Sequence, residues 1–293
     1  MMKDHMIRGT GFGSQVRFFA ASTKDTVEEA RRIHDTYPLC TAALGRLLTA
    51  GAMMGAMGKN DTDIITLRID GDGPIGGITV TADSHAGVKG IIYNNHVELP
   101  LRADNHLDVG RGVGKGTLSV IKDFGMKDPY VGQTLLHSGE IAEDLTYYFA
   151  ESEQIPTSVA LGVLVDTDCS VKQAGGFIIQ MMPFASDETV SIVEKNLSQF
   201  GSVTNSFENG NSVLEMIKNI IPDAEVESEI PVKYFCNCSR DRVRRALESL
   251  GNKELQSMID DGESVNLHCD FCNKDYLFTI DEINDIKKTL NLQ

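Results

Sequence analysis

Four of the chain's six cysteines lie near its C-terminus in two tight pairs, Cys236 with Cys238 and Cys269 with Cys272. Zinc favours four thiolates in a tetrahedron, and two short turns can each supply two of them. The same spacing places each thiol within disulfide reach of a neighbour, and a chance spacing of unliganded thiols is the third alternative. The pattern predicts a metal site and leaves open whether the thiols form a permanent staple or a switch.

The other candidate ligands are weaker. His268 adjoins Cys269, and because four thiols are available we expect its side chain at the surface or behind the ligands. Cys40 and Cys169 are single thiols in the apolar contexts YPLCTAAL and VDTDCSVK, without a paired spacing that would support chemistry. Both are predicted to be buried and inert.

Charge argues against a nucleic-acid binder. The chain has 293 residues and a formal net charge of −15, and residues 184–230 alone carry nine acids against two lysines, a net of −7. Phosphate contacts need clustered Lys and Arg. The basic cluster from Arg240 to Arg245 is interrupted by Asp241 but could bind phosphate. It keeps one alternative open, a constitutive zinc-ribbon module that binds RNA or ribosomes.

The sequence MMKDHMIRGT lacks the apolar segment of a secretory signal, and the most apolar stretch, residues 40–58, is interrupted by Arg46. We therefore expect a cytoplasmic protein with neither export nor a membrane span. Thiols stay reduced in that compartment, so paired cysteines indicate metal or redox chemistry more than structural disulfides.

The spacing of apolar residues and turns predicts an α+β fold in three parts. Helices are expected over 23–37, 40–57 and 139–151, and antiparallel strands over 14–22, 63–70, 76–83, 87–94, 116–123, 157–167 and 174–183. We predict an antiparallel-sheet-rich α+β core domain at 1–183, an acidic helical linker at 184–230 and a small zinc-binding domain at 231–293.

The predicted linker carries two amphipathic helices without a sheet of their own. The first spans 186–200, a polar turn-rich stretch covers 201–211, and a second short helix follows. Their apolar stripes are Val190, Val193, Leu197 and Phe200 in the first helix, and Val213, Leu214, Ile217 and Ile221 in the second. Such stripes stabilise a helix only when buried, so we expect both helices to pack on another part of the protein.

The last segment should contain a Ser239-capped helix that ends before Gly251, a second helix near 252–260, a hairpin around the CxxC pair, and a final helix with a possible capping box of Thr279 and Glu282. A segment of about sixty residues has a marginal core, whereas a structural zinc can contribute on the order of 10 kcal/mol to folding. Removing the metal should therefore unfold it.

Catalytic motifs are weak. Asp83, Ser84 and His85 are sequence neighbours whose side chains point in different directions, and His137 has no evident nucleophile. The GDGPIG segment at 71–76 fits a dinucleotide fingerprint, but a strand follows it where a helix is needed. We predict no catalytic residues, and an enzyme that uses a pocket in the core is the third hypothesis.

Taken together, these residues resemble the redox-regulated holdase chaperones known as the thirty-three-kilodalton heat-shock protein family. The matching pieces cover essentially the whole chain: GDGPIGGITVTADSHAGVKGIIYN, YVGQTLLHSGEIAEDLTYYFAESEQIPTSVALGVLV, AGGFIIQMMP, and the terminal CNCSRDR with CDFCNKDY. The pairing of CxC with CxxC is the most specific element. The spacing between the two pairs departs from the family, which does not put the ligands in doubt.

The resemblance implies a reduced state in which the protein is inactive as a chaperone. In that state one zinc per chain is bound by Cys236, Cys238, Cys269 and Cys272. It further implies that oxidant joins Cys236 to Cys238 and Cys269 to Cys272, that zinc leaves, and that the terminal region unfolds, so that residues 231–293 act as a redox-switch domain. Family members hold unfolding client proteins during oxidative stress without hydrolysing ATP, and they pass from monomer to homodimer on activation. The expected partners are such clients and a second copy, with no specific nucleic acid and no membrane.

Overall fold

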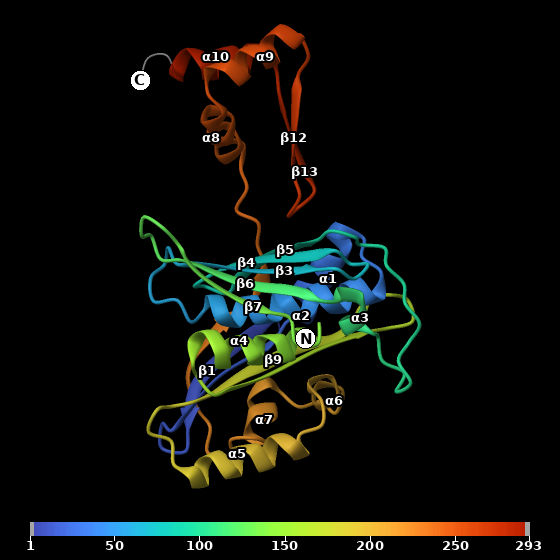
Figure 1. The fold of residues 1–293 in the computed structure, drawn as a ribbon, viewed down its shortest axis with the longest axis vertical. Helices are drawn as coiled ribbons and strands as arrows, with labels where there is room; N and C mark the ends of the chain where they lie inside the picture. Colours follow the sequence, from blue (N-terminus) through green and yellow to red (C-terminus); the bar gives the residue numbers. More distant parts are fainter. Residues whose placement is uncertain (1–2, 291–293) are drawn as a thin grey trace. The chain divides into compact units, whose positions relative to one another are not determined.

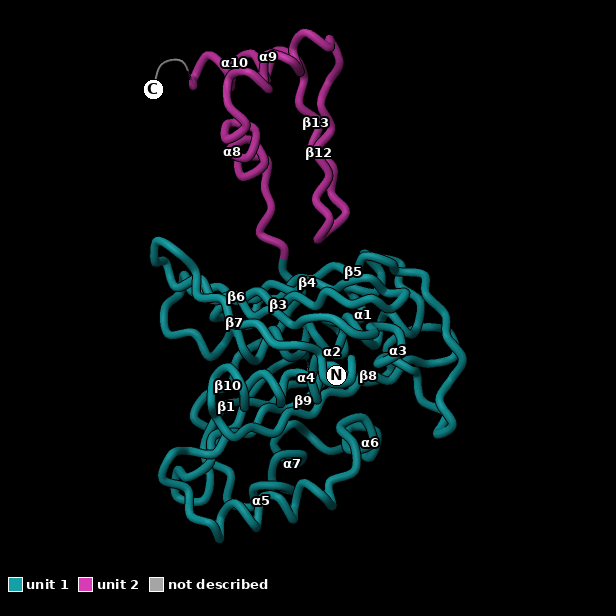
Figure 2. The backbone as a smooth tube through the Cα atoms, viewed as in Figure 1, with its two compact units in different colours: residues 1–235 teal, residues 236–293 magenta. Residues whose placement is uncertain are grey.

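The computed structural model describes residues 3–290 and divides into two compact units, residues 1–235 and 236–293 (Figures 1 and 2). The first unit contains two sheets and most of the helices, and the second is a small helix and hairpin unit. Within residues 3–290, each helix is too short or too polar to cross a membrane. The predicted α+β class with antiparallel sheets is confirmed.

Two sheets form the frame of the first unit. Sheet A has the strand order β10-β1-β2-β9-β8 and consists of β1 His5–Gly11, β2 Val16–Ser22, β8 Thr157–Val165, β9 Val171–Met181 and β10 Glu225–Pro231. Sheet B has the order β11-β5-β4-β3-β6-β7 and consists of β3 Ile64–Gly71, β4 Gly77–Asp83, β5 Gly87–Ile92, β6 Gly116–Asp123, β7 Tyr130–Leu135 and β11 Lys233–Tyr234. Neighbouring strands are antiparallel except β11, which joins β5 in parallel.

Helices fill the space between the sheets. They are α1 Lys24–His34, α2 Pro38–Gly55, the short α3 Val109–Val113, and α4 Ile141–Tyr148, which continues into the π-helical turn η1 Phe149–Glu153. The central helix α2 lies between the two sheets and is buried along nearly its whole length (Figure 1). Its small residues permit this, because a Cβ on Gly51 would lie 2.6 Å from Cγ1 of Val80 in β4.

Strand β2 is buried on both faces because its side chains alternate between two cores. Phe19 and Ala21 belong to the core between the sheets, whereas Phe18 and Ala20 belong to a second core on the other face of sheet A. That other face is covered by three helices, α5 Asp187–Gln199, α6 Val203–Glu208 and α7 Val213–Lys218 (Figure 1). The docking of the amphipathic helices on the rest of the protein, which the sequence predicts, is therefore confirmed.

Two features of the segment 184–230 differ from the sequence analysis. The stretch 201–211 contains the helix α6, whose first turn is capped by the Ser202 hydroxyl accepting from the Asn205 amide at 3.2 Å. Residues 225–231 form β10, which pairs with β1 near the other end of the chain. The division into core, linker and switch stays a prediction, while the boundary between compact units lies between Phe235 and Cys236.

The second unit follows the predicted order of elements. It contains α8 Arg240–Leu250, α9 Asn252–Asp261, the hairpin of β12 Val265–Cys269 and β13 Lys274–Phe278, and α10 Ile280–Leu290. Ser239 caps α8 by accepting from the Arg242 amide at 3.2 Å, and Thr279 exchanges hydrogen bonds with Glu282 in the predicted capping box. The fully buried core is small and consists of Leu247, Leu255, Phe278, Ile283 and Ile286.

Candidate metal centre

Two local turns of the second unit present the four cysteines. Cys236 and Cys238 lie in the extended segment just before α8, whose first residue follows the cap at Ser239. Cys269 ends β12, and Cys272 lies in the turn that leads into β13. That turn closes on the Cys269 carbonyl, which accepts from the amides of Cys272 at 3.1 Å and of Asn273 at 2.9 Å.

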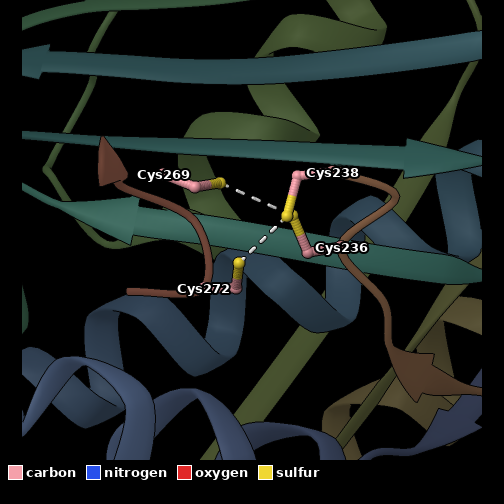
Figure 3. A group of neighbouring side chains, drawn as sticks. All are labelled: Cys236, Cys238, Cys269 and Cys272. Atoms are coloured by element: carbon pink, nitrogen blue, oxygen red, sulfur yellow. Dashed lines mark hydrogen bonds between the residues drawn. The ribbon is translucent and has the colours of Figure 1, made fainter. Parts of the chain in front are cut away.

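The four sulfurs converge. All four Sγ atoms lie within 4.8 Å of one another, and Figure 3 shows the side chains pointing toward one another from two separate segments. The Cys236 and Cys269 sulfurs are 3.8 Å apart, and those of Cys238 and Cys272 are 3.2 Å apart. A tetrahedral zinc with Zn–S bonds of about 2.3 Å places its sulfurs about 3.8 Å from one another. The donor set and its spacing therefore fit one metal ion that prefers thiolates.

A tyrosine completes the surroundings of the sulfurs. The Tyr276 hydroxyl donates to the sulfur of Cys238 at 3.1 Å. Partial burial raises the pKa of Cys238, but hydrogen bonds from Tyr276 and the other thiols outweigh burial and lower this pKa to about 7. The same hydrogen bond raises the pKa of Tyr276 to about 12, and burial together with the hydrogen bond to Cys238 raises that of Cys272. These hydrogen bonds favour the thiolate form of Cys238.

Sequence reasoning missed Tyr276, although a signal for it exists. In the hairpin, Tyr276 pairs with Leu267 and Cys269 pairs with Lys274. Residues two apart on a strand share a face, and directly opposed residues share it too. The register therefore places Tyr276 on the face of Cys269, but only once the hairpin turn has been fixed.

The arginine cluster is largely committed to the fold of this unit. Arg240 donates to the Leu277 carbonyl at 2.8 Å and to Glu282 at 2.6 Å, and its guanidinium lies 4.4 Å from the Phe278 ring centroid. Arg244 pairs with Glu248 at 3.2 Å. The contacts of Arg240 connect α8 with β13 and α10, whereas the Arg244 pair stays within α8, so the RNA-binding alternative loses part of its basic surface.

The remaining candidates lie apart from the four sulfurs. His268 is exposed and pairs with Asp275 at 2.9 Å, as expected for a residue at the surface. Cys40 is buried as predicted and donates its thiol hydrogen to the Asn94 carbonyl at 3.3 Å, and burial raises its pKa. The prediction that Cys169 is buried is wrong. It is exposed on the turn between β8 and β9, with a left-handed φ of 67° that keeps it out of the strand core.

Comparison with known proteins gives one family. The model of the family described as Hsp33 protein matches residues 4–279. The 33 kDa chaperonin of Agathobacter rectalis is 52% identical over 288 residues, which cover 98% of this chain and 100% of that protein. The 33 kDa chaperonin of Lachnoclostridium phytofermentans is 50% identical over 287 residues, covering 97% and 98%. The crystal structure of the 33 kDa chaperonin of Thermotoga maritima, a heat shock protein 33 homolog, has a TM-score of 0.90 at 37% identity and covers 100% of both chains.

Proposed function

The chain belongs to the Hsp33 protein family, and from that premise we propose that it is an ATP-independent holdase chaperone switched by oxidation of its four-thiol site. It would protect unfolding client proteins from aggregation and would catalyse no reaction. The observation that carries the proposal is the convergence of four thiols in a unit whose buried core, up to residue 290, has five side chains. A fold that depends so strongly on its thiols can be switched through them.

In the reduced state the four thiolates would act as one cross-link between the segment before α8 and the β12–β13 turn. Bound zinc, one ion per chain, would supply folding free energy on the order of 10 kcal/mol to this unit. Tyr276 would hold the Cys238 sulfur through its hydroxyl, and the Cys269 carbonyl would hold the turn that carries Cys272. The protein in this state would be inactive as a chaperone.

Oxidation would consume the same donors. A thiolate attacks peroxide, the O–O bond breaks, and a sulfenic acid forms while one oxygen leaves as water. The neighbouring thiol then attacks the sulfenic sulfur, the S–S bond forms, and the second oxygen leaves as water. Two such reactions, joining Cys236 to Cys238 and Cys269 to Cys272, would leave no thiolate for a metal and would unfold the second unit.

The connection to client binding runs through the chain itself. Residues 225–231 form the edge strand β10 of sheet A, and residues 233–234 form the edge strand β11 of sheet B. The Phe235 amide donates to the Val88 carbonyl at 2.8 Å, and the next residue is Cys236. Unfolding beyond Cys236 would leave β11 at the end of the folded chain. Fraying of β11 and then of β10 from the sheet edges would favour release of α5, α6 and α7.

Released helices would expose a surface suited to unfolded chains. Val193, Ile217 and Ile221 are buried against sheet A, and an apolar patch of this kind binds unfolded segments when exposed. The net charge of −7 over 184–230 would keep the released segment soluble and its docking weak, because like charges repel.

An aggregation assay tests the proposal. Reduced and peroxide-treated protein are added to a thermally unfolding client while light scattering is recorded. We expect suppression by the oxidised protein only, with disulfides within each sequence-adjacent pair found by peptide mapping. Equal activity of the reduced and oxidised forms would contradict the proposed switch. Disulfides between the two cysteine pairs would contradict the proposed pairing of Cys236 with Cys238 and of Cys269 with Cys272.

We also propose a cytoplasmic location and a change from monomer to homodimer on activation. Cysteines in two closely spaced pairs fit a reducing compartment, where thiols stay available for a metal. Size-exclusion chromatography with light scattering, run before and after peroxide treatment, tests the change of assembly. An unchanged mass in an oxidised sample that suppresses aggregation would rule out the dimer as the active form.

A further inference from the structure

An open cavity of about 540 Å³ lies where the ends of β8 and β9 meet the segment that enters α5. Its volume is within the range of small-molecule sites, about 300–1,000 Å³. Apolar side chains dominate the lining, among them Pro156, Met181, Ala185 and Val190. Arg17 is the one charged residue of this lining, so the cavity has an apolar wall and a single cation.

Hydrogen bonds on the side of the sheet hold the guanidinium of Arg17 in place. Its Nε donates to Oε1 of Gln180 at 2.8 Å, and the fully buried Gln180 donates in turn to the Thr157 hydroxyl at 3.1 Å. The guanidinium also lies 6.0 Å from the Phe19 ring centroid. These contacts fix the orientation of the group and leave its two terminal nitrogens for another acceptor.

Arg17 has no acidic partner among residues 3–290. The nearby Lys122, by contrast, forms an ion pair with Glu153 at 2.5 Å. Burial lowers the pKa of Arg17, as expected for a cation that is partly removed from water without a compensating charge. An incoming anion would find an oriented guanidinium that does not have to give up another ion pair.

A neighbouring cavity determines which end of a bound ligand lies at Arg17. It has a volume of about 170 Å³, lies between α5 and the ends of β8 and β9, and shares Pro156, Met181 and Val190 with the first cavity. Glu194 is the one charged residue in its lining. An anionic head is therefore attracted at Arg17 and repelled at Glu194, while the shared wall between them is apolar.

We propose that this groove binds a single-chain amphiphile with a carboxylate head, of the fatty-acid class, with the head on Arg17 and the chain along Met181 and Val190. Met181 belongs to β9 and Val190 belongs to α5. The bound chain would therefore contact the sheet and the helix together, and it would hold α5 in its docked position. This site is separate from the thiols and needs neither metal nor oxidant.

Calorimetric titration of the reduced full-length protein with decanoate, below its micellar concentration, tests the site. Acetate and decanol are the comparators, because each lacks one half of the proposed ligand. We expect decanoate to bind most tightly and the Arg17→Gln variant to bind it about tenfold or more weakly, as for loss of a charged hydrogen bond. Arg68→Gln is the matched control, since Arg68 also lies on a strand but pairs with Asp70 at 2.8 Å.

A second variant and a second readout separate binding from folding. Ala185→Phe fills the cavity without touching the arginine, and it should also abolish decanoate binding. Decanoate should slow amide exchange in residues 187–199 of the wild type and not in either variant. Decanol that binds as tightly as decanoate, or decanoate binding that survives both variants, would overturn the proposal and leave the chaperone function untouched.

Discussion

Tyr276 donates its hydroxyl hydrogen to the sulfur of Cys238 across 3.1 Å, so a strand of the hairpin supports a thiol from the segment before α8. Groups of this kind orient metal ligands, and their loss typically weakens metal binding about 10–100-fold. We predict that Tyr276→Phe lowers the zinc affinity of the reduced protein by about tenfold or more. Competition with a chromogenic chelator measures it. Tyr130→Phe, on the exposed strand β7, should leave the affinity at the wild-type value.

The four cysteines should be required for metal binding and the other two dispensable. We predict about one zinc per chain in the reduced wild type and loss of that zinc in the double variant Cys269→Ser with Cys272→Ser. The double variant Cys40→Ala with Cys169→Ser should retain both zinc and oxidative activation, because neither thiol lies in the cluster. Elemental analysis and the aggregation assay provide the two readouts. A folded Cys40 and Cys169 variant that no longer activates would contradict the two-pair scheme.

Docking of the linker helices should be the step that controls client binding. Ile217 of α7 is fully buried, and truncating such a side chain alone costs about 2–5 kcal/mol. Because a buried carboxylate costs more still, Ile217→Asp should release the helices and make the reduced protein active in the aggregation assay. Lys218→Ala is the control, because Lys218 is exposed in the same helix.

Limited proteolysis tests whether release of the helices explains the activity of the Ile217→Asp variant. Residues 184–230 should become sensitive in the Ile217→Asp variant and in oxidised wild type, while residues 3–183 stay resistant. A variant with a cleavable linker that still lets the client aggregate would show that helix release is insufficient for client binding.

One acid should give the first unit a measurable dependence on pH. Hydrogen bonds from Arg31, together with those from the Val171 amide and from Arg32, lower the pKa of Glu28 to about 2, against an unfolded value of 4.5. The stabilisation by Glu28 is therefore complete above about pH 4.5 and is lost as the pH falls toward 2. Glu28→Gln should lower the free energy of unfolding by about 1–2 kcal/mol at pH 7 and by little at pH 2.

Urea unfolding monitored by amide exchange in α1 measures this difference, and comparison with wild type at each pH cancels protonation of the thiols. Glu29→Gln is the matched control, because Glu29 is the exposed neighbour on the same helix. A Glu28 variant whose deficit is the same at pH 2 and pH 7 would show that packing, rather than charge, explains its effect.

Local signals in the sequence were enough to predict the helices, the hairpin and the thiol cluster of the second unit. The Ser239 cap, the Thr279–Glu282 box and the spacing of the thiols each act over a few residues, and the structure contains all of them. Apolar periodicity likewise located α2 and α5, because both helices bury a continuous surface.

Strands that depend on distant partners were missed. β10 has the sequence EVESEIP, whose acids suggest a solvated linker, and its pairing with β1 joins residues more than two hundred positions apart. β1 was missed for a related reason, since Gly9 weakens its strand pattern. That glycine is required, because a Cβ there would lie 1.9 Å from the Glu225 carbonyl oxygen of β10.

The segment 225–235 supplies the edge strand of both sheets within a few residues, and this has a consequence for synthesis of the protein on the ribosome. Until these residues emerge, β1 and β5 of the nascent chain are open edges, with free backbone groups that can pair with other chains. Contacts between distant segments also form late in folding. Premature termination before residue 225 would therefore produce a chain with two unpaired sheet edges that is itself prone to aggregate. A protein proposed to prevent aggregation would thus depend on completed translation for its own solubility.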